Sequence, residues 1–157
     1  MSPVERSARV VIIASQFNQP ITRALVHGAT DTLRRHGVAA RSIRLLWVPG
    51  AFELPIVAAR VAASRQPPDA ILALGAIIRG ETIQYAVLAH AVLQALALVA
   101  VQTHVPVTSG VVVASTLAQA RARAGLPRLP PPLAGSRRRR ENGADYEICT
   151  PFIFCKA

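Results

Sequence analysis

The sequence is poor in lysine, acidic residues, aromatic residues and cysteine. Only 8 of its 157 residues are Asp or Glu, 4% are aromatic, and Lys156 is the only lysine. Cys149 and Cys155 are too few and too close together for the disulfide framework of a small secreted protein. The net charge of +10 comes almost entirely from arginine. A GC-rich coding sequence accounts for such a bias, so the charge alone is a weak argument for nucleic-acid binding.

The chain also lacks an uninterrupted hydrophobic segment of membrane-spanning length. Its longest apolar stretch, Tyr85 to Val101, contains His90 and Gln94 and falls short of the ~20 residues that a spanning helix needs. The polar start, Met1 to Arg9, leads directly into a short apolar run, without the hydrophobic core of a signal peptide. We therefore expect a soluble cytoplasmic protein with no membrane partner.

Residues with the spacing of a metal or nucleotide site are absent as well. The four histidines are scattered, and the glycine spacing matches neither a dinucleotide fingerprint nor a Walker P-loop. No Cys–His or Ser–His–Asp spacing supports nucleophilic catalysis. The sequence thus predicts neither a metal centre nor a bound cofactor. The histidines are His27, His36, His90 and His104.

Short β-branched runs alternate with longer Ala/Leu-rich segments over the first 120 residues. This alternation, with 52% hydrophobic residues and a mean hydropathy of +0.35, predicts an α/β protein. Because the predicted strands are apolar throughout, we expect a four-stranded parallel sheet with helices on both faces, a three-layer doubly wound sandwich. The predicted strands are Arg9 to Ala14, Ile43 to Val48, Ala70 to Leu74 and Val107 to Ala114. The predicted helices are Ile21 to His36, Leu54 to Ser64, Glu81 to Thr103 and Leu117 to Ala124.

The composition changes after Gly125. Leu126 to Leu133 holds four prolines, and Arg137 to Arg140 follows as a basic run. We therefore divide the chain into an α/β domain over residues 1–125 and a Pro/Arg-rich tail over residues 126–157. The tail is either a foreign extension or the product of an altered reading frame. The basic run lacks the interleaved aromatic residues of nucleic-acid binders, so we expect no nucleic-acid partner.

Ligands of doubly wound sheets bind beyond the carboxyl ends of the strands, which draws attention to three loops. Phe17 and Asn18 offer a stacking face and an amide, or simply cover the core. Glu53 follows a Pro-Gly turn and serves either as an acceptor for a polyhydroxylated ligand or as a charge favoured by the helix dipole. Gly80 to Thr82 precedes the long helix and forms either an anion site or an ordinary helix cap.

Taken together, these loops are far more specific than any one of them. In order and spacing, from Val10 to Gly125, they closely resemble the lumazine synthase family, which implies a flavodoxin-like fold. The matching segments are Phe17-Asn18, Trp47-Val-Pro-Gly-Ala-Phe-Glu-Leu-Pro55, Leu74-Gly-Ala-Ile-Ile-Arg-Gly-Glu-Thr82, Pro106-Val-Thr-Ser-Gly-Val111 and Ala118-Gln-Ala-Arg-Ala-Arg-Ala-Gly125.

The resemblance implies an enzyme of riboflavin biosynthesis that uses no cofactor. The family joins 5-amino-6-(D-ribitylamino)uracil to 3,4-dihydroxy-2-butanone 4-phosphate and forms 6,7-dimethyl-8-ribityllumazine. Its pocket lies between neighbouring subunits of a homopentamer, or of a shell of pentamers. The residues that the resemblance assigns to the pyrimidine are Phe17, Asn18, Ala76, Ile77 and Ile78. Those that it assigns to the ribityl chain are Ala51, Phe52 and Glu53.

The resemblance also assigns a phosphate site and a proton-transfer position. The phosphate is expected at the start of the long helix, where Arg123 pairs with it. Ser109 stands where the family usually has an aromatic residue. The residues that the resemblance assigns to the phosphate are Gly80, Glu81, Thr82 and Arg123.

The chain departs from the family where a proton is transferred. The family's histidine position holds Gln84, whose amide cannot replace imidazole as an acid or base near neutral pH. Ala86 replaces the acidic residue two positions further on, and the family's Asn-Lys-Gly element and final helix are missing. The sequence therefore predicts a lumazine synthase with impaired proton transfer. The alternative is a catalytically weak paralogue that binds a lumazine or a flavin.

Overall fold

The structure is a computed structural model that describes residues 8–127. In this part of the chain, strands and helices alternate in the predicted order. The strands are β1 Val10–Ser15, β2 Ile43–Val48, β3 Ala70–Ile78 and β4 Val107–Ala114. The helices are α1 Gln19–Arg35, α2 Leu54–Ala62, α3 Gln84–Thr103 and α4 Leu117–Arg123, with short 3-10 helices η1 Ala40–Ser42 and η2 Ala51–Glu53.

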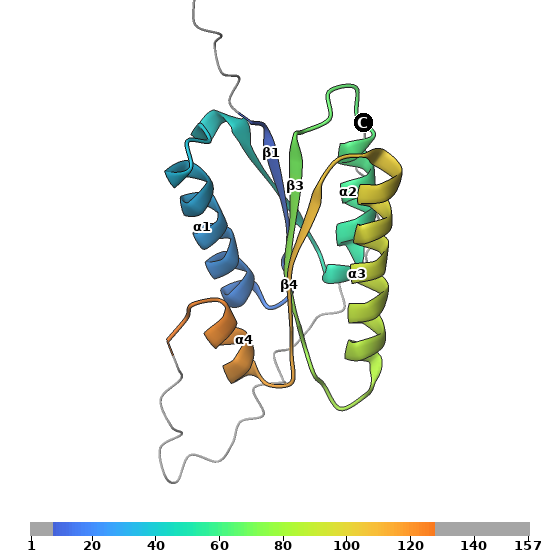
Figure 1. The fold of residues 1–157 in the computed structure, drawn as a ribbon. Helices are drawn as coiled ribbons and strands as arrows, with labels where there is room; N and C mark the ends of the chain where they lie inside the picture. Colours follow the sequence, from blue (N-terminus) through green and yellow to red (C-terminus); the bar gives the residue numbers. More distant parts are fainter. Residues whose placement is uncertain (1–7, 128–157) are drawn as a thin grey trace, which may run out of the picture.

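The four strands form one parallel sheet in the order β2-β1-β3-β4. α1 and α4 cover one face, and α2 and α3 cover the other (Figure 1). This three-layer α/β sandwich confirms the predicted fold class. The chain leaves β1 toward β2 on one side and later returns to place β3 on the other side. The topological switch point, where such sheets bind ligands, therefore lies between β1 and β3.

Two predicted boundaries were wrong, and both flank the third loop. β3 continues to Ile78 instead of ending at Leu74, because β4 pairs with it as far as the Ile78–Ala114 register. α3 begins at Gln84 rather than at Glu81. Residues that we expected in a loop thus extend the sheet. The other boundaries differ from the predictions by two residues or fewer.

Both faces of the sheet are packed, as the apolar strands require. On β1, Ile13 belongs to the core beneath α2 and α3, whereas its neighbour Ile12 belongs to the core beneath α1. Both side chains are fully buried. Alternate residues point to opposite faces of a strand, so burial on both faces makes β1 apolar along its whole length. This sheet is the rigid base from which the site loops project.

α3 is apolar on both sides, although only one side is buried. Its inner face packs on the sheet and α2 through Ala89, Val92, Leu96 and Val99. Outside this inner face it exposes Val87, Leu93, Leu98 and Val101. At 20 residues, the helix is long and apolar enough to cross a membrane by length and composition alone. The expectation that the longest apolar segment is too short to do so was therefore wrong. Its packed inner face is that of a core helix of an α/β sandwich.

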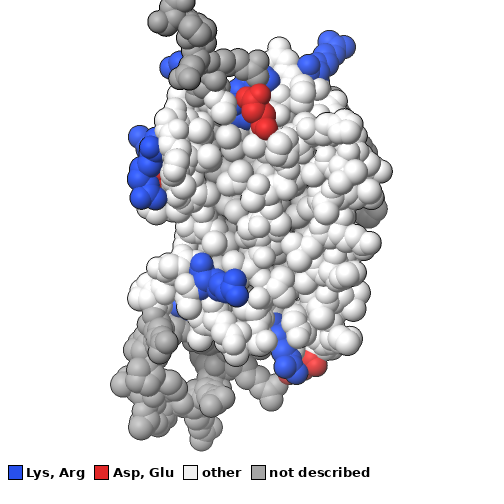
Figure 2. All heavy atoms as spheres, viewed as in Figure 1, with Lys and Arg blue, Asp and Glu red and all other residues white. Residues whose placement is uncertain are grey.

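The proposed tail lies largely outside the described residues. Cys149, Cys155 and Arg137–Arg140 fall in that part, so the predictions about them stay untested. Among the described residues, the acidic side chains of Asp31 and Asp69 pair with His27 and Arg9 respectively. Figure 2 shows basic side chains scattered over the visible face rather than gathered in one patch. This face of the described domain therefore offers no continuous track for a polyanion.

Candidate active site

The first two site loops lie side by side at the carboxyl edge of the sheet. Gln16 donates its backbone N–H to Val48 O at 2.7 Å, and Phe17 donates its own to Pro49 O at 3.1 Å. These bonds continue the pairing of β1 with β2 beyond the regular strands. The Phe17 side chain is 50% exposed. The structure thus presents an aromatic ring at the edge where the sequence predicted a stacking face.

Asn18 spans the crevice at the switch point. It has a left-handed backbone (φ 58°) and precedes α1, but its side chain makes no capping bond to the helix. Instead, its Nδ2 donates to Ala76 O on β3 at 2.9 Å. That carbonyl is available because β1 stops pairing with β3 at Leu74, whereas β3 runs on to Ile78. Asparagine is among the preferred helix-capping residues and tolerates a left-handed backbone. Because its side-chain amide bonds to β3 instead of capping α1, we infer a role for it at the switch point.

The second loop holds Glu53 in a fixed position. Its Oε2 accepts the backbone N–H of Gly50 at 2.8 Å across the turn that precedes α2. Ala51 is buried, whereas Phe52 is 68% exposed. The Pro49-Gly50 turn therefore positions one carboxylate and one aromatic ring beside the first loop. The second oxygen of Glu53 has no hydrogen bond with the described residues, which keeps an acceptor available for a ligand.

The third loop differs most from the prediction. Ala76 and Ile77 are buried within β3, and only from Ile78 onward does the chain reach the edge. Thr82 is not the helix cap, since Ile83 occupies that position. The Thr82 hydroxyl nevertheless accepts the backbone N–H of Gln84, the first helical residue, at 3.4 Å.

All the residues of this connection, from Arg79 to Ile83, are exposed. The segment Gly80 to Thr82 is thus one turn further from the helix than predicted. Its backbone and the Thr82 hydroxyl still face the start of α3.

One predicted site residue, Ser109, lies apart from this group within one chain. Ser109 pairs with Ala73 on β3, three positions before the residue of β4 that pairs with Ala76. At ~3.3 Å per residue, that places it about 10 Å back along the sheet. Arg123 is on α4, which packs on the α1 face beside Ala76 and Ile78, whereas the turn at Thr82 leads to α3 on the opposite face (Figure 1). A single chain therefore does not bring Ser109 to the other predicted residues, but it does place Arg123 beside the end of β4 at the carboxyl edge.

The sequence did not predict a close contact between the end of β1 and β3. Ser15, the last residue of β1, is fully buried, and its Oγ has no hydrogen-bond partner among the described residues. Gly75 of β3 faces it so closely that a Cβ there would lie 2.9 Å from Ser15 Oγ. A polar residue at the end of an otherwise apolar strand is the only sequence signal for this contact. The glycine is needed because the two strands have no room for another carbon.

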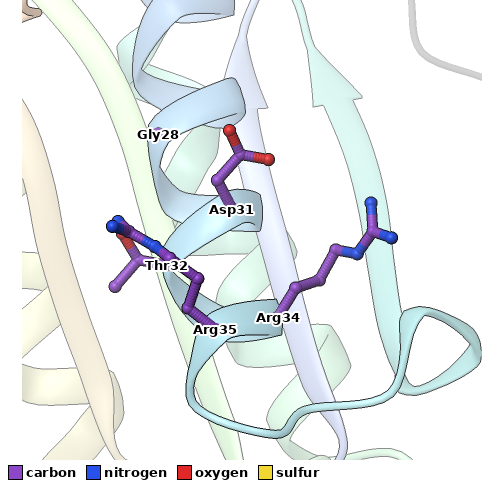
Figure 3. Close-up of a pocket in the computed structure, with 5 residues that line it drawn as sticks. All are labelled: Gly28, Asp31, Thr32, Arg34 and Arg35. Atoms are coloured by element: carbon purple, nitrogen blue, oxygen red, sulfur yellow. The ribbon is translucent and has the colours of Figure 1, made fainter.

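A pocket at the same edge, beside the end of β4, is lined by Val113, Ala114, Gln119, Ala122 and Arg123. The described surface along α1 forms no comparable site. A depression along α1 is lined by residues of that helix alone, and Figure 3 shows its side chains diverging. Within it, Arg35 donates to the Thr32 hydroxyl at 3.2 Å, and Asp31 pairs with His27. No group of three or more potential metal ligands occurs among residues 8–127. The crevice at the carboxyl edge is therefore the candidate site. The residues that line the depression are Gly28, Asp31, Thr32, Arg34 and Arg35.

The fold is that of a doubly wound α/β protein, and aromatic and polar side chains gather at the switch point where such sheets bind small molecules. The sequence model of the 6,7-dimethyl-8-ribityllumazine synthase family matches residues 7–143. A protein of that name from Kosmotoga olearia is 41% identical over 118 residues, which cover 75% of each chain. Its namesake from Leuconostoc mesenteroides is 38% identical over 121 residues, or 77% of each chain. The chain belongs to the 6,7-dimethyl-8-ribityllumazine synthase family.

The match to the family confirms the resemblance drawn from the loop motifs. It extends beyond Gly125 to residue 143 and so enters the segment that we assigned to the tail. The boundary at residue 125 stays a prediction.

Proposed function

We propose that this protein is a lumazine synthase. It condenses 5-amino-6-(D-ribitylamino)uracil with 3,4-dihydroxy-2-butanone 4-phosphate to form 6,7-dimethyl-8-ribityllumazine. The observation that carries the proposal is the bond from Asn18 to the Ala76 carbonyl at the switch point, at the same edge of the sheet as Phe17 and Glu53. Membership of the family supports the same reaction. The cytoplasmic location remains part of the proposal.

Each loop contributes a different kind of contact. The exposed ring of Phe17 stacks on the pyrimidine, and the free end of β3 at Ile78 offers backbone groups to its edge. Glu53 accepts hydrogen bonds from the ribityl hydroxyls through the oxygen that Gly50 leaves free. The exposed turn at Gly80 and Thr82 receives the phosphate of the second substrate. Holding both substrates in this way replaces a bimolecular encounter with an oriented one.

Gln84 limits proton transfer in this pocket. It is exposed at the first turn of α3, where an imidazole would serve as acid and base. An amide does neither near neutral pH, although it donates and accepts hydrogen bonds. We therefore expect a higher kcat in Gln84→His, where an imidazole is restored at this position. An unchanged kcat in that variant would contradict the assigned role of position 84.

A second copy of the chain completes the pocket. Within one chain, Ser109 lies away from the Phe17 and Thr82 loops. The exposed apolar face of α3 gives a neighbouring copy a surface to cover. We propose a homopentamer, alone or within a larger shell, in which Arg123 of one subunit reaches the phosphate bound by the next.

Subunit mixing tests the shared pocket. The variants Phe17→Ala and Arg123→Ala each remove one half of the site, so each pure variant should turn over slowly. Oligomers reassembled from both contain some pockets in which both contributing halves are intact. Mixing should therefore recover a substantial share of wild-type activity. Mixed oligomers no more active than the pure variants would show that both residues serve the same pocket from the same chain.

A further inference from the structure

The carboxyl edge offers few side chains that can move a proton. The reaction needs such a group, because the carbon bearing the 3-hydroxyl must lose its proton as the phosphate leaves. Among the described residues at this edge, the candidates are Glu53, Glu81 and Tyr85. No histidine lies there, since His27 and His36 are on α1 away from the loops, and His90 and His104 are further along α3. Among the described residues that one chain contributes to this edge, these three are the candidates for that step.

Two of the three are already engaged. Glu53 holds the Gly50 N–H with one oxygen and lies in the loop assigned to the ribityl chain. Tyr85 is half-buried and packs against the core beneath α2 and α3. Glu81, in contrast, is exposed in the turn before α3 and makes no hydrogen bond or ion pair with the described residues. It is the carboxylate of this edge that can turn toward a substrate.

The position of Glu81 fits the step that needs a base. It adjoins Thr82, whose turn receives the phosphate under the proposed function, and it lies three residues before Gln84. The carbon that carries the phosphate and the carbon next to it therefore bind close to Glu81. A carboxylate does not itself hold a phosphate, because the two negative charges repel each other. Arg79 on the same segment, Glu53 on η2 and Arg123 beside the end of β4 are the other described charges at this part of the edge.

We propose that Glu81 is the proton-transferring residue of this lumazine synthase, in place of the missing histidine. This inference rests on the proposed function. After the imine has formed, the Glu81 carboxylate removes the proton from C3 of the butanone unit. The C–H electron pair becomes the C3–C4 double bond, and the C4–O bond breaks to release inorganic phosphate. Protonated Glu81 then returns the proton to C4, which becomes a methyl group. The enol at C3 turns into the ketone as its O–H proton passes to the released phosphate.

Glu81→Gln keeps the size and hydrogen-bonding capacity of the side chain but cannot take a proton. We expect kcat to fall by ~10²–10⁴-fold, the usual contribution of general acid–base catalysis. KM for the butanone phosphate should stay the same or decrease, because a negative charge beside the phosphate is removed. The pH dependence of kcat that a carboxylate imposes should disappear. Asp31→Asn, at an exposed site on α1 away from the crevice, is the matched control and should leave both constants unchanged.

Rescue by imidazole distinguishes catalysis from binding. In the Glu81→Gln background, adding Gln84→His should recover much of the lost kcat and introduce a dependence on pH near neutrality. A Glu81→Gln variant with wild-type kcat would overturn the proposal, as would a loss seen only as a raised KM. Failure of the wild-type protein to form any lumazine would instead overturn the proposed function itself.

Discussion

The Glu53 carboxylate has two separable tasks, which a pair of substitutions can distinguish. One oxygen accepts the Gly50 N–H at 2.8 Å and fixes the turn before α2. The other oxygen is assigned to the ribityl hydroxyls. Glu53→Gln keeps an acceptor for Gly50 but removes the charge, whereas Glu53→Ala removes both.

The expected magnitudes follow from the hydrogen bonds. A bond to a charged group contributes about 1.5–3 kcal/mol, and one to a neutral group contributes about 0.5–1.5 kcal/mol. Glu53→Gln should therefore weaken ribityl binding by about 1 kcal/mol, which corresponds to a roughly fivefold rise in KM for the ribitylaminouracil. Glu53→Ala also leaves the Gly50 N–H without its partner. It should lower the free energy of unfolding by about 1–2 kcal/mol, or Tm by about 2–8 °C.

Steady-state kinetics with each substrate varied in turn, together with thermal unfolding, measure both effects. The KM for the butanone phosphate serves as the internal control, since Glu53 is assigned no contact with that substrate. An unchanged KM for the ribitylaminouracil in both variants would refute the assignment to the ribityl chain. An unchanged Tm in Glu53→Ala would refute the role of the bond to Gly50.

Three further changes test other parts of the account. Gly110→Ala places a Cβ 2.5 Å from Leu74 Cδ2 in the core and should cost about 1–3 kcal/mol of stability, so an unaltered Tm would contradict this packing. Asn18→Asp tolerates the left-handed backbone but cannot donate a hydrogen bond to Ala76 O. Calorimetric titration with a product analogue should therefore show weaker binding. Wild-type affinity would argue against a role for this hydrogen bond in the site. Val87→Asp places a charge on the outer face of α3, where Val87 is 62% exposed. Light scattering should then detect smaller assemblies of folded protein. An assembly with the mass of the wild-type oligomer would place the subunit contact elsewhere.

The sequence was sufficient for the fold because its signals are local. Apolar strands bounded by glycine and proline, with amphipathic helices between them, define a doubly wound sheet. The end of β3 was missed because Gly75 within an apolar run is typical of a loop. Its continuation to Ile78 depends on pairing with β4, some thirty residues further along the chain, which no local pattern reveals.

The site was predicted in its parts but not in its arrangement. Phe17 and Glu53 lie at the predicted edge because strand ends determine where loops emerge. The bond from Asn18 to Ala76 joins residues 58 positions apart and follows from the different lengths of β1 and β3. The position of Arg123 beside the end of β4 follows from the face of the sheet that α4 covers. Sequence spacing carries neither kind of information.

The most direct test of the central claim is a turnover assay with purified wild-type protein. Ribitylaminouracil and the butanone phosphate are mixed with the protein, and lumazine fluorescence is followed against the uncatalysed background. The account predicts product formation above that background, with phosphate released in equal amount. No product from an assembled oligomer that still binds a product analogue would contradict the account and identify a lumazine- or flavin-binding protein instead.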